Sequence, residues 1–489
     1  MNLRRLLLLS LALGTSPWLR DAVPCAQLAR AADKRPPGPK LFIIVAPERF
    51  RPALAEYVAY KQKLRPTEVV SLEDVLQSSA GVDAPERLKR YLYEAWRKRR
   101  LGYLLLVGDV DVMPVRYMVL DRSNPAAFNY AFYPSDLYYA DLAKPDGTFE
   151  DWNAMKQGFH ARYFGEVRGE KNKRGPINYD QIDYRPEIAF GRWPVSTEKE
   201  VGIVAAKTIA YEEGIRDGTH PGLRRADFFN VEKYVDARDR MTGWAAKMPP
   251  GWTVGRYFYQ DDKKPYQTPP PDEAHVVASL NRGAALAVHV GHGSDHSWFR
   301  SFSTGSLKKL RDADRLPVML SVGCSTGNFA PLPPYTAYVD VEGKEHVGTD
   351  HKEVFQAPPP PPSPFQKGKY NPTGLGEQVL KRGPGGAVVY IGCNTGAQPC
   401  AVTLAEGFLA AMQHSEQPLV GDCWSSAIRY YYSREKLATL VPNNDWYPPS
   451  IFFQAMKFMF FGDPTVPFAH SMKKSIAGSP PTSLQGTLQ

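Results

Sequence analysis

The chain has 489 residues, of which 43% are hydrophobic and 23% are charged, a composition typical of a globular protein large enough for two packed domains or subdomains. Its formal net charge of +9 is scattered along the sequence, which argues against a protein that binds nucleic acid. Five cysteines are too few to staple a fold of this size, so a disulfide framework is excluded as the source of stability.

The N-terminal segment has the pattern of an export signal. A basic pair, Arg4-Arg5, and a short apolar run precede a small-x-small cleavage site, Ala29-Arg30-Ala31. We therefore predict a signal peptide over residues 1–31, with an uncleaved interfacial anchor as the alternative. The protein is expected to be exported, to the periplasm, the cell surface or the medium. A stiff, proline-rich linker over residues 32–39 follows it.

The next part of the chain alternates between apolar runs and helical patterns with charged outer faces. This alternation is typical of a mostly parallel sheet covered on both faces, so we predict an N-terminal α/β subdomain over residues 40–220. A long loop is expected over residues 120–185. We predict no cofactor, with a structural calcium ion at the Asp-rich stretch of this loop, Asp136 to Asp151, as the alternative, although the spacing there matches no defined calcium loop. The predicted strands are 41–45, 102–109 and 188–192, and the predicted helices are 51–64, 84–99 and a segment from a Ser196 N-cap to about residue 213.

A second α/β subdomain is predicted over residues 221–470, and a flexible polar tail over residues 471–489. A proline-rich insertion, residues 331–372, interrupts this subdomain, and its run Pro358 to Pro362 favours an extended, exposed segment. Because it leaves the chain seven residues after Cys324, it is either a surface insertion or a cover over a site there. The predicted strands are 227–231, 284–290, 316–322 and 386–392, and the predicted helices are 237–247, 274–281, 374–382 and 404–413.

Two glycine-framed segments follow two of these strands, His289-Val-Gly-His-Gly-Ser294 and Val322-Gly-Cys-Ser-Thr-Gly-Asn-Phe329. If the strands are neighbours, His292 and Cys324 meet at one edge of the sheet and form the thiolate–imidazole pair of a cysteine hydrolase. The N–H groups of Gly293 and Cys324 are then candidates for the two donors of an oxyanion hole.

Structural roles and a metal site are the alternatives for the cysteine and histidine residues. Cys324 taken alone fits a buried structural cysteine, and Cys393 and Cys400 are close enough in sequence to form a disulfide. His289, His292 and His296 invite a zinc site, but His289 lies within the strand and fits a hydrogen-bonded core residue better. We therefore expect no metal at this site.

The two motifs resemble those of the gingipain family of cysteine endopeptidases. The resemblance covers about residues 40–470 in consistent order. It is carried by Gly291-His-Gly-Ser-x-x-x-Trp298, Cys324-x-x-Gly-x-Phe329, Leu106-Val-Gly-Asp-Val110, Ser135-Asp136 with Tyr139, Gly191-Arg192 before a helix ending in Tyr211-Glu212, the strand from Gly386, and Phe461-Gly-Asp-Pro-Thr465.

The resemblance implies a caspase-like α/β/α fold with mostly parallel sheets, in two side-by-side subdomains, and a site in the second one. It implies His292 as general base and acid, Cys324 as nucleophile, and the Gly293 N–H in the oxyanion hole. It also implies an acidic residue after an upstream strand that orients the histidine. Glu232 is the positional match, with a solvated loop acid as the alternative.

Known gingipains prefer Arg or Lys before the cut bond, through an acidic residue in the pocket. Asp236 and Asp239 are the candidates for that acid here, and their spacing leaves the preference open. The sequence therefore predicts an exported cysteine endopeptidase that cleaves protein or peptide substrates through an acyl-enzyme and is compatible with association with the cell envelope. A sortase-like transpeptidase of the same family and a catalytically idle surface scaffold are the alternatives.

Overall fold

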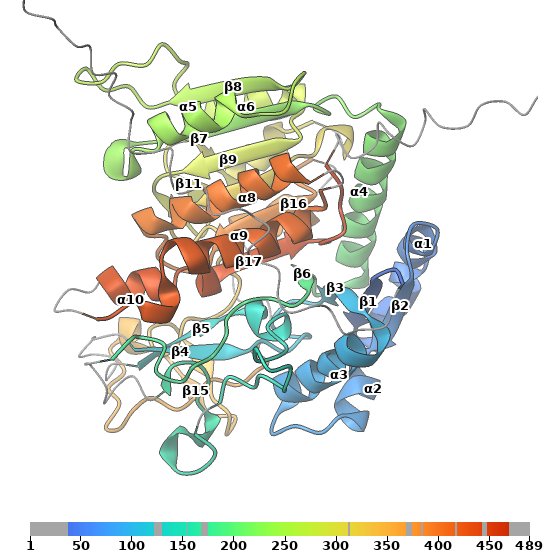
Figure 1. Cartoon of the computed structure of the whole chain (residues 1–489), viewed down its shortest axis with the longest axis vertical. Coiled ribbons are helices and arrows are strands. Elements are labelled where there is room, and N and C mark those ends of the chain that lie inside the picture. Colours follow the sequence, from blue (N-terminus) through green and yellow to red (C-terminus); the bar gives the residue numbers. More distant parts are fainter. Residues whose placement is uncertain are drawn as a thin grey trace, which may run out of the picture. The chain divides into compact units, whose positions relative to one another are not determined.

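A ten-stranded sheet forms the centre of this computed structural model (Figure 1). The structure describes residues 38–468 except 122–129, 154, 168–174, 312, 368–373, 383–384, 416–417 and 443–446. The predicted signal peptide, most of the predicted linker and the predicted tail lie outside the described residues. In order across the sheet, the strands are β2 (Thr67–Ser71), β1 (Leu41–Ala46), β3 (Leu101–Val107), β6 (Ala189–Trp193), β17 (Phe458–Gly462), β16 (Val389–Cys393), β13 (Val318–Val322), β9 (Leu286–Val290), β7 (Arg225–Asn230) and β8 (Thr253–Phe258).

The sheet consists of two parallel halves that run in opposite directions. The five strands from β2 to β17 are parallel to one another, as are the five from β16 to β8. The halves meet where β16 pairs antiparallel with β17. The boundary predicted near residue 220 falls in the loop between α4 (Glu198–Asp217) and β7, and β17 is the one strand from the later part of the chain that runs with the earlier half.

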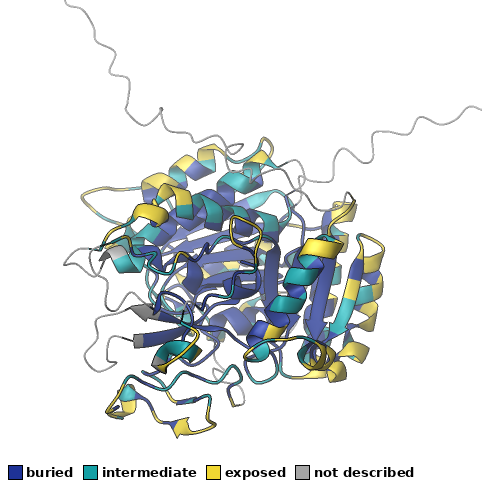
Figure 2. Ribbon diagram, turned by 60° about the horizontal axis from the view of Figure 1, so that its bottom comes forward, coloured by how far each residue is buried: buried dark blue, intermediate teal, exposed yellow. Residues whose placement is uncertain are grey.

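Helices cover both faces of the sheet, because alternate residues of each strand point to opposite sides. Ile43 and Val45 of β1 belong to one core cluster and Phe42 and Ile44 to the other. Every residue of β1, β3, β9, β13 and β16 is buried (Figure 2). The first face packs against α2 (Leu72–Ser78), α3 (Ala84–Arg99), α5 (Arg238–Ala246), α8 (Val402–His414), α9 (Val420–Arg434) and α10 (Tyr447–Phe452), and the second against α1 (Arg51–Gln62), α4, α6 (Glu273–Arg282) and α7 (Leu375–Lys381). This arrangement confirms the expected α/β/α fold class.

Side-chain caps fix where several helices begin. Asp83 accepts a hydrogen bond from the backbone N–H of Glu86 at the start of α3, and Thr197 caps α4 by accepting one from Glu200. The sequence prediction of a Ser196 cap was therefore one residue early. Its end near residue 213 was wrong as well, because α4 continues to a left-handed Gly218 (φ 75°).

The long loop predicted over residues 120–185 is only partly a loop. It contains most of a two-stranded hairpin, β4 (Tyr117–Asp121) and β5 (Tyr130–Pro134), that stands apart from the main sheet. The prediction also missed β2, β8, β17, α2, α9 and α10. The edge strand β8 is half exposed, so it lacks the continuous apolar run that identified the buried strands.

The proline-rich insertion is packed against the earlier half of the chain. It forms a small hairpin, β14 (Tyr338–Val339) with β15 (Glu345–His346). Within the polyproline run, Pro359 and Pro362 are buried, and the Pro359 carbonyl accepts a hydrogen bond from the Tyr163 hydroxyl at 2.6 Å. The expectation of an exposed segment was therefore wrong, because proline lacks a donor but keeps a carbonyl that can be satisfied by a neighbour.

None of the helices in the described ranges is long and apolar enough to cross a membrane.

Candidate active site

The site lies where three neighbouring parallel strands end in register. Asn230 of β7 pairs with Val290 of β9, and Val290 pairs with Val322 of β13. Two residues beyond these aligned positions come Glu232, His292 and Cys324. In an open α/β sheet, the carboxyl ends of parallel strands form the edge at which ligands bind. The register therefore brings all three predicted residues to one such edge.

Glu232 holds the imidazole and the backbone of His292. Its Oε1 lies 3.4 Å from His292 Nε2 and accepts the His292 backbone N–H at 3.1 Å. Gly291, with φ 138°, makes this approach possible, because a Cβ there would lie 2.5 Å from Val231. Of the two roles open for Glu232 from sequence, the geometry favours the acid that orients the histidine.

Gly293 lies directly against the backbone of Cys324. A Cβ at Gly293 would lie 3.0 Å from the Cys324 carbonyl oxygen and 2.4 Å from Thr326 Cγ2. Gly293 opens a short hairpin, β10 (Gly293–Ser294) with β11 (Ser297–Trp298). Since the Phe299 N–H donates to the His292 carbonyl at 2.9 Å, Gly293 and Trp298 form a non-hydrogen-bonded pair. The Gly293 N–H thus points away from the hairpin.

Cys324 sits half-buried in a sharp turn. Ser325 has a left-handed backbone (φ 57°), and its N–H donates to the Thr395 carbonyl at 2.8 Å. The Cys324 Sγ lies 3.7 Å from the Ala397 carbonyl oxygen, its hydrogen-bond acceptor within the described chain. The Cys324 thiol therefore donates its hydrogen bond to Ala397 in this geometry.

No cysteine in the described ranges belongs to a disulfide, so the pairing that the sequence allowed between Cys393 and Cys400 is not formed. Burial raises the pKa of Cys393 to about 12 and also raises the pKa of Cys423. A thiol with a raised pKa remains protonated at neutral pH and is a poor nucleophile. Cys324 and Cys400 are the two half-buried thiols.

The three histidines of the first motif are held by three different partners. His289 is fully buried, its Nδ1 lies 2.9 Å from the Ser321 hydroxyl, and its ring stacks on Trp298 at 4.7 Å. Burial lowers the pKa of His289 to about 3. His296 is exposed and contacts Asp295. His289 is thus the hydrogen-bonded core residue that its position in the strand indicated.

A group of three carboxylates in the earlier half of the chain could hold a metal ion. Carboxylate oxygens of Asp141, Asp183 and Glu187 all lie within 4.8 Å of one another. Asp141 Oδ2 accepts hydrogen bonds from Trp152 Nε1 at 2.6 Å and from the Tyr184 N–H at 3.0 Å, while Oδ1 has no partner within the described chain. Only Asp141 falls in the Asp-rich stretch that the sequence indicated. The other two lie some forty residues later, where nothing in the spacing connects them to it.

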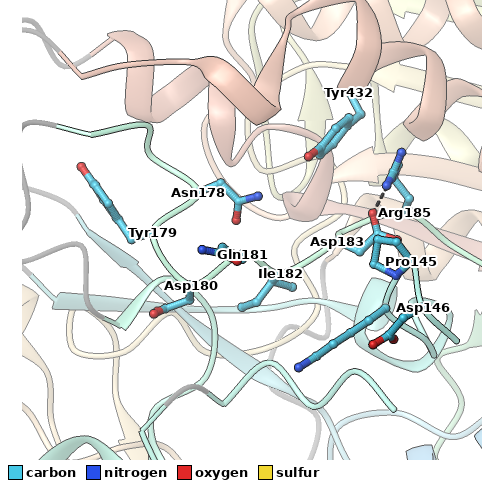
Figure 3. Close-up of a pocket in the computed structure, with 11 residues that line it drawn as sticks. Pro145, Asp146, Asn178, Tyr179, Asp180, Gln181, Ile182, Asp183, Arg185 and Tyr432 are labelled. Carbon is cyan, nitrogen blue, oxygen red and sulfur yellow. Dashed lines mark hydrogen bonds and ion pairs between the residues drawn. The ribbon is translucent and has the colours of Figure 1, made fainter. Parts of the chain in front are cut away.

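A cavity of about 650 Å³ borders this carboxylate group (Figure 3). Asp183 and Arg185 line it and contact each other, and Tyr432 closes one side. Neither His292, Cys324 nor Glu232 lines this cavity. It is therefore separate from the edge of the sheet that carries the three predicted residues.

Residues 35–469 match the model of Peptidase family C25. The chain belongs to peptidase family C25. Among curated relatives, it is 21% identical to gingipain R2 of Porphyromonas gingivalis over 289 residues, 59% of this chain and 32% of that protein. It is 20% identical to gingipain R1 of the same organism, over 59% of this chain and 24% of that protein. The chain thus spans about a third of the curated relatives' length or less.

Solved structures of gingipains share the fold. The crystal structure of the Arg-specific cysteine proteinase gingipain R (RgpB) superposes with a TM-score of 0.56 at 15% identity, covering 88% of this chain and 78% of that one. The complex of P. gingivalis RgpB pro- and mature domains gives 0.55 at 16% identity, covering 87% and 79%. These matches confirm the gingipain-like fold that the motifs indicated.

Proposed function

We propose that this member of a cysteine-peptidase family is an exported endopeptidase that cleaves protein or peptide chains through a covalent acyl-enzyme. The observation that carries the proposal is the register of β7, β9 and β13, which brings Glu232, His292 and Cys324 to adjoining strand ends. Family membership supports the reaction class, and the predicted signal peptide supports export.

In the first half-reaction, His292 accepts the proton of the Cys324 thiol and the sulfur attacks the carbonyl carbon of the substrate. A turn about the Cys324 side chain takes Sγ from Ala397 toward the imidazole. Because Glu232 faces Nε2, Nδ1 is the ring nitrogen left to take the proton. The negative oxygen of the tetrahedral intermediate accepts hydrogen bonds from the N–H groups of Gly293 and Cys324.

The intermediate collapses when His292 gives its proton to the departing amine, which leaves a thioester on Cys324. In the second half-reaction, His292 takes a proton from water, the hydroxide adds to the thioester carbonyl, and the acid product leaves as the sulfur regains the proton. Glu232 acts through His292: its carboxylate stabilises the imidazolium that forms in both steps and fixes the ring.

The test compares wild type with Cys324→Ala and His292→Ala on a mixed peptide library, together with labelling by an acyloxymethyl ketone probe. We expect both variants to lose turnover by at least about 10²-fold, since each removes a group that takes part in the bond changes. Glu232→Gln is expected to lower kcat and shift the acid limb of its pH profile, which a merely structural role would not move. Cys400→Ser, which removes the other half-buried thiol, is the matched control.

Three results would contradict the endopeptidase. Folded wild type that is neither labelled nor active would indicate an idle scaffold. Acyl transfer to an added amine in place of hydrolysis would indicate a transpeptidase. Activity that survives Cys324→Ala would exclude Cys324 as the nucleophile.

We also propose that Asp141, Asp183 and Glu187 hold a structural calcium ion, since carboxylate oxygens are the ligands that Ca²⁺ prefers. Added Ca²⁺ is expected to raise the Tm of chelator-treated wild type, because an ion bound only by the folded state stabilises it. Asp141→Asn should abolish the shift, and Asp146→Asn, an exposed acid in the same region, should leave it intact. Equal shifts in all three proteins would place the ion elsewhere.

A further inference from the structure

Two exposed aromatic side chains contact the ring of His292. Tyr234 is 51% exposed and Phe299 is 40% exposed, and they are the only exposed aromatic residues in the described part of the chain. The Tyr234 ring stacks on the His292 ring with centroids 4.6 Å apart and planes 18° apart. The Phe299 ring meets the same imidazole edge-on at 6.0 Å and 79°.

Backbone contacts hold both rings in place. Tyr234 belongs to a short 3₁₀ turn, Lys233–Val235, and the Asn230 side chain donates to carbonyls on both sides of it, those of Glu232 and Val235. Phe299 is fixed by its N–H bond to the His292 carbonyl. Aromatic side chains that remain exposed to solvent because their backbone is fixed, and that lie beside a candidate catalytic residue, are typical of a binding surface.

The acidic residues of the two loops that carry these rings already have partners. In the loop 232–239, Asp236 makes a two-pronged contact with the Arg238 guanidinium at 2.8 Å per oxygen, and Asp239 contacts Lys264 and the Tyr266 hydroxyl. These pairs engage both candidates for an acid that would bind a substrate cation.

The other charged residues near the two rings also disfavour the binding of a substrate cation. Glu232 faces His292, and in the loop 291–300 Asp295 contacts His296. The Arg300 guanidinium lies 4.8 Å from the Phe299 ring centroid, so a cation already occupies a face of that ring. A substrate guanidinium or ammonium would meet paired carboxylates and a positive neighbour, whereas an apolar side chain would meet two exposed rings.

We propose that Tyr234 and Phe299 form the contact surface for the substrate side chain beside the cut bond, and that the enzyme prefers an uncharged apolar or aromatic residue there over Arg or Lys. This inference rests on the proposed peptidase function. It assigns to this chain a substrate class different from that in the name of the Arg-specific gingipain R with which it shares the fold.

The test is a set of fluorogenic peptides that differ only at the residues beside the cut bond, carrying Leu, Phe, Ala, Arg, Lys or Asp. Wild type is expected to cleave the Leu or Phe peptides with kcat/KM at least about tenfold above the Arg and Lys peptides. Tyr234→Ala and Phe299→Ala should each lower kcat/KM for the Leu and Phe peptides by about tenfold. The ratio of kcat/KM between these peptides and the Ala peptide should fall as a result. Tyr234→Phe keeps the ring and should keep the preference, and Val82→Ala, an exposed apolar residue on another loop, is the control.

Alkylation of Cys324 by iodoacetamide, followed by peptide mapping, is measured in every variant to separate two kinds of failure. A preference for Arg or Lys that Asp236→Asn abolishes would overturn the inference and leave the peptidase standing. Aromatic variants that slow the cleavage of all peptides equally would also overturn it. So would a wild type whose Cys324 reacts with iodoacetamide but which, when left untreated, cleaves none of the peptides. A wild type that neither cleaves a peptide nor reacts at Cys324 would overturn the proposed function and this inference with it.

Discussion

His289 and His292 lie three residues apart, and their surroundings give them opposite chemistry. His289 is fully buried and stacked on Trp298, so charging its ring would place a cation in an apolar core. His292 is 45% exposed and lies 3.4 Å from the Glu232 carboxylate, so its ring remains in contact with solvent. The end of β9 at Val290 separates them: His289 lies within the strand, and His292 lies in the loop beyond it.

The buried state of His289 predicts a loss of stability in mild acid. Its pKa is lowered by burial to about 3, against about 6.5 for an unfolded chain. The folded state therefore binds fewer protons between these values, so the contribution of His289 is full above about pH 6.5 and is lost as the pH falls toward 3. Urea unfolding should show wild type losing up to about 2 kcal/mol between pH 6.5 and pH 5 from this residue.

His289→Gln should be less stable than wild type at pH 7.5 and should lose less stability on acidification, because no ring remains to be protonated. His351→Gln, at an exposed histidine, is the control and should keep the wild-type slope. Parallel pH slopes for His289→Gln and wild type would mean that other groups account for the acid sensitivity.

At the scale of elements, the site depends on strand register more than on any one loop. The two motifs could be found in the sequence because glycine frames each of them and an apolar run precedes each. The partner of His292 could not be settled in this way, because Glu232 follows an ordinary short strand. Only the pairing of β7 with β9, which aligns Asn230 with Val290, shows that this acid meets the histidine. Tyr234 and Phe299 carry no sequence signal at all, since exposure of an aromatic residue is a tertiary property.

The insertion is the element for which sequence left two roles. Its described backbone contacts reach the earlier half of the chain: Phe132 donates to the Pro333 carbonyl and Val115 to the Pro364 carbonyl, at 2.7 and 2.9 Å, and the Gln366 N–H donates to Val110. These contacts favour a segment docked on that half.

Replacing residues 333–366 by a short Gly-Ser linker is accordingly expected to lower the Tm, since these backbone bonds and the bond from Tyr163 to Pro359 are lost and each contributes about 1 kcal/mol. Tripeptide kinetics should remain within a few-fold. Tyr163→Phe, which removes only the bond to Pro359, should have a much smaller effect on Tm. Faster cleavage of a folded protein, with no change for the tripeptide, would instead support the cover over the site.

At the scale of the whole molecule, buried ion pairs connect segments that are distant in sequence. Several belong to the motifs that carry the family resemblance outside the dyad. Arg192 of β6 is fully buried and makes a two-pronged contact with Asp136 at 2.7 Å per oxygen. Glu212 of α4 and Asp463 after β17 both contact Lys61 of α1. Those motifs therefore supply buried ion pairs that join distant segments of the fold, while the two glycine-framed motifs carry the proposed catalytic residues.

Lys61 gives the sharpest test of how much these buried ion pairs stabilise the fold. It is fully buried, contacts both carboxylates and donates to the Thr465 hydroxyl at 2.8 Å, so it connects α1, α4 and the segment that follows β17. Lys61→Met removes the cation and leaves two buried carboxylates uncompensated, which is expected to cost about 3–5 kcal/mol of unfolding free energy in denaturant titration. Lys63→Met, at an exposed lysine two residues on, should change the unfolding free energy by less than about 0.5 kcal/mol.

Adding Glu212→Gln and Asp463→Asn to Lys61→Met should recover part of the lost unfolding free energy, because the carboxylates that the lysine neutralised are then gone. A triple variant less stable than Lys61→Met alone would contradict this account. The hydrogen bonds that the carboxylates accept, such as the one from Tyr57 to Asp463 at 2.7 Å, would then contribute more to stability than the compensation of their charges by Lys61.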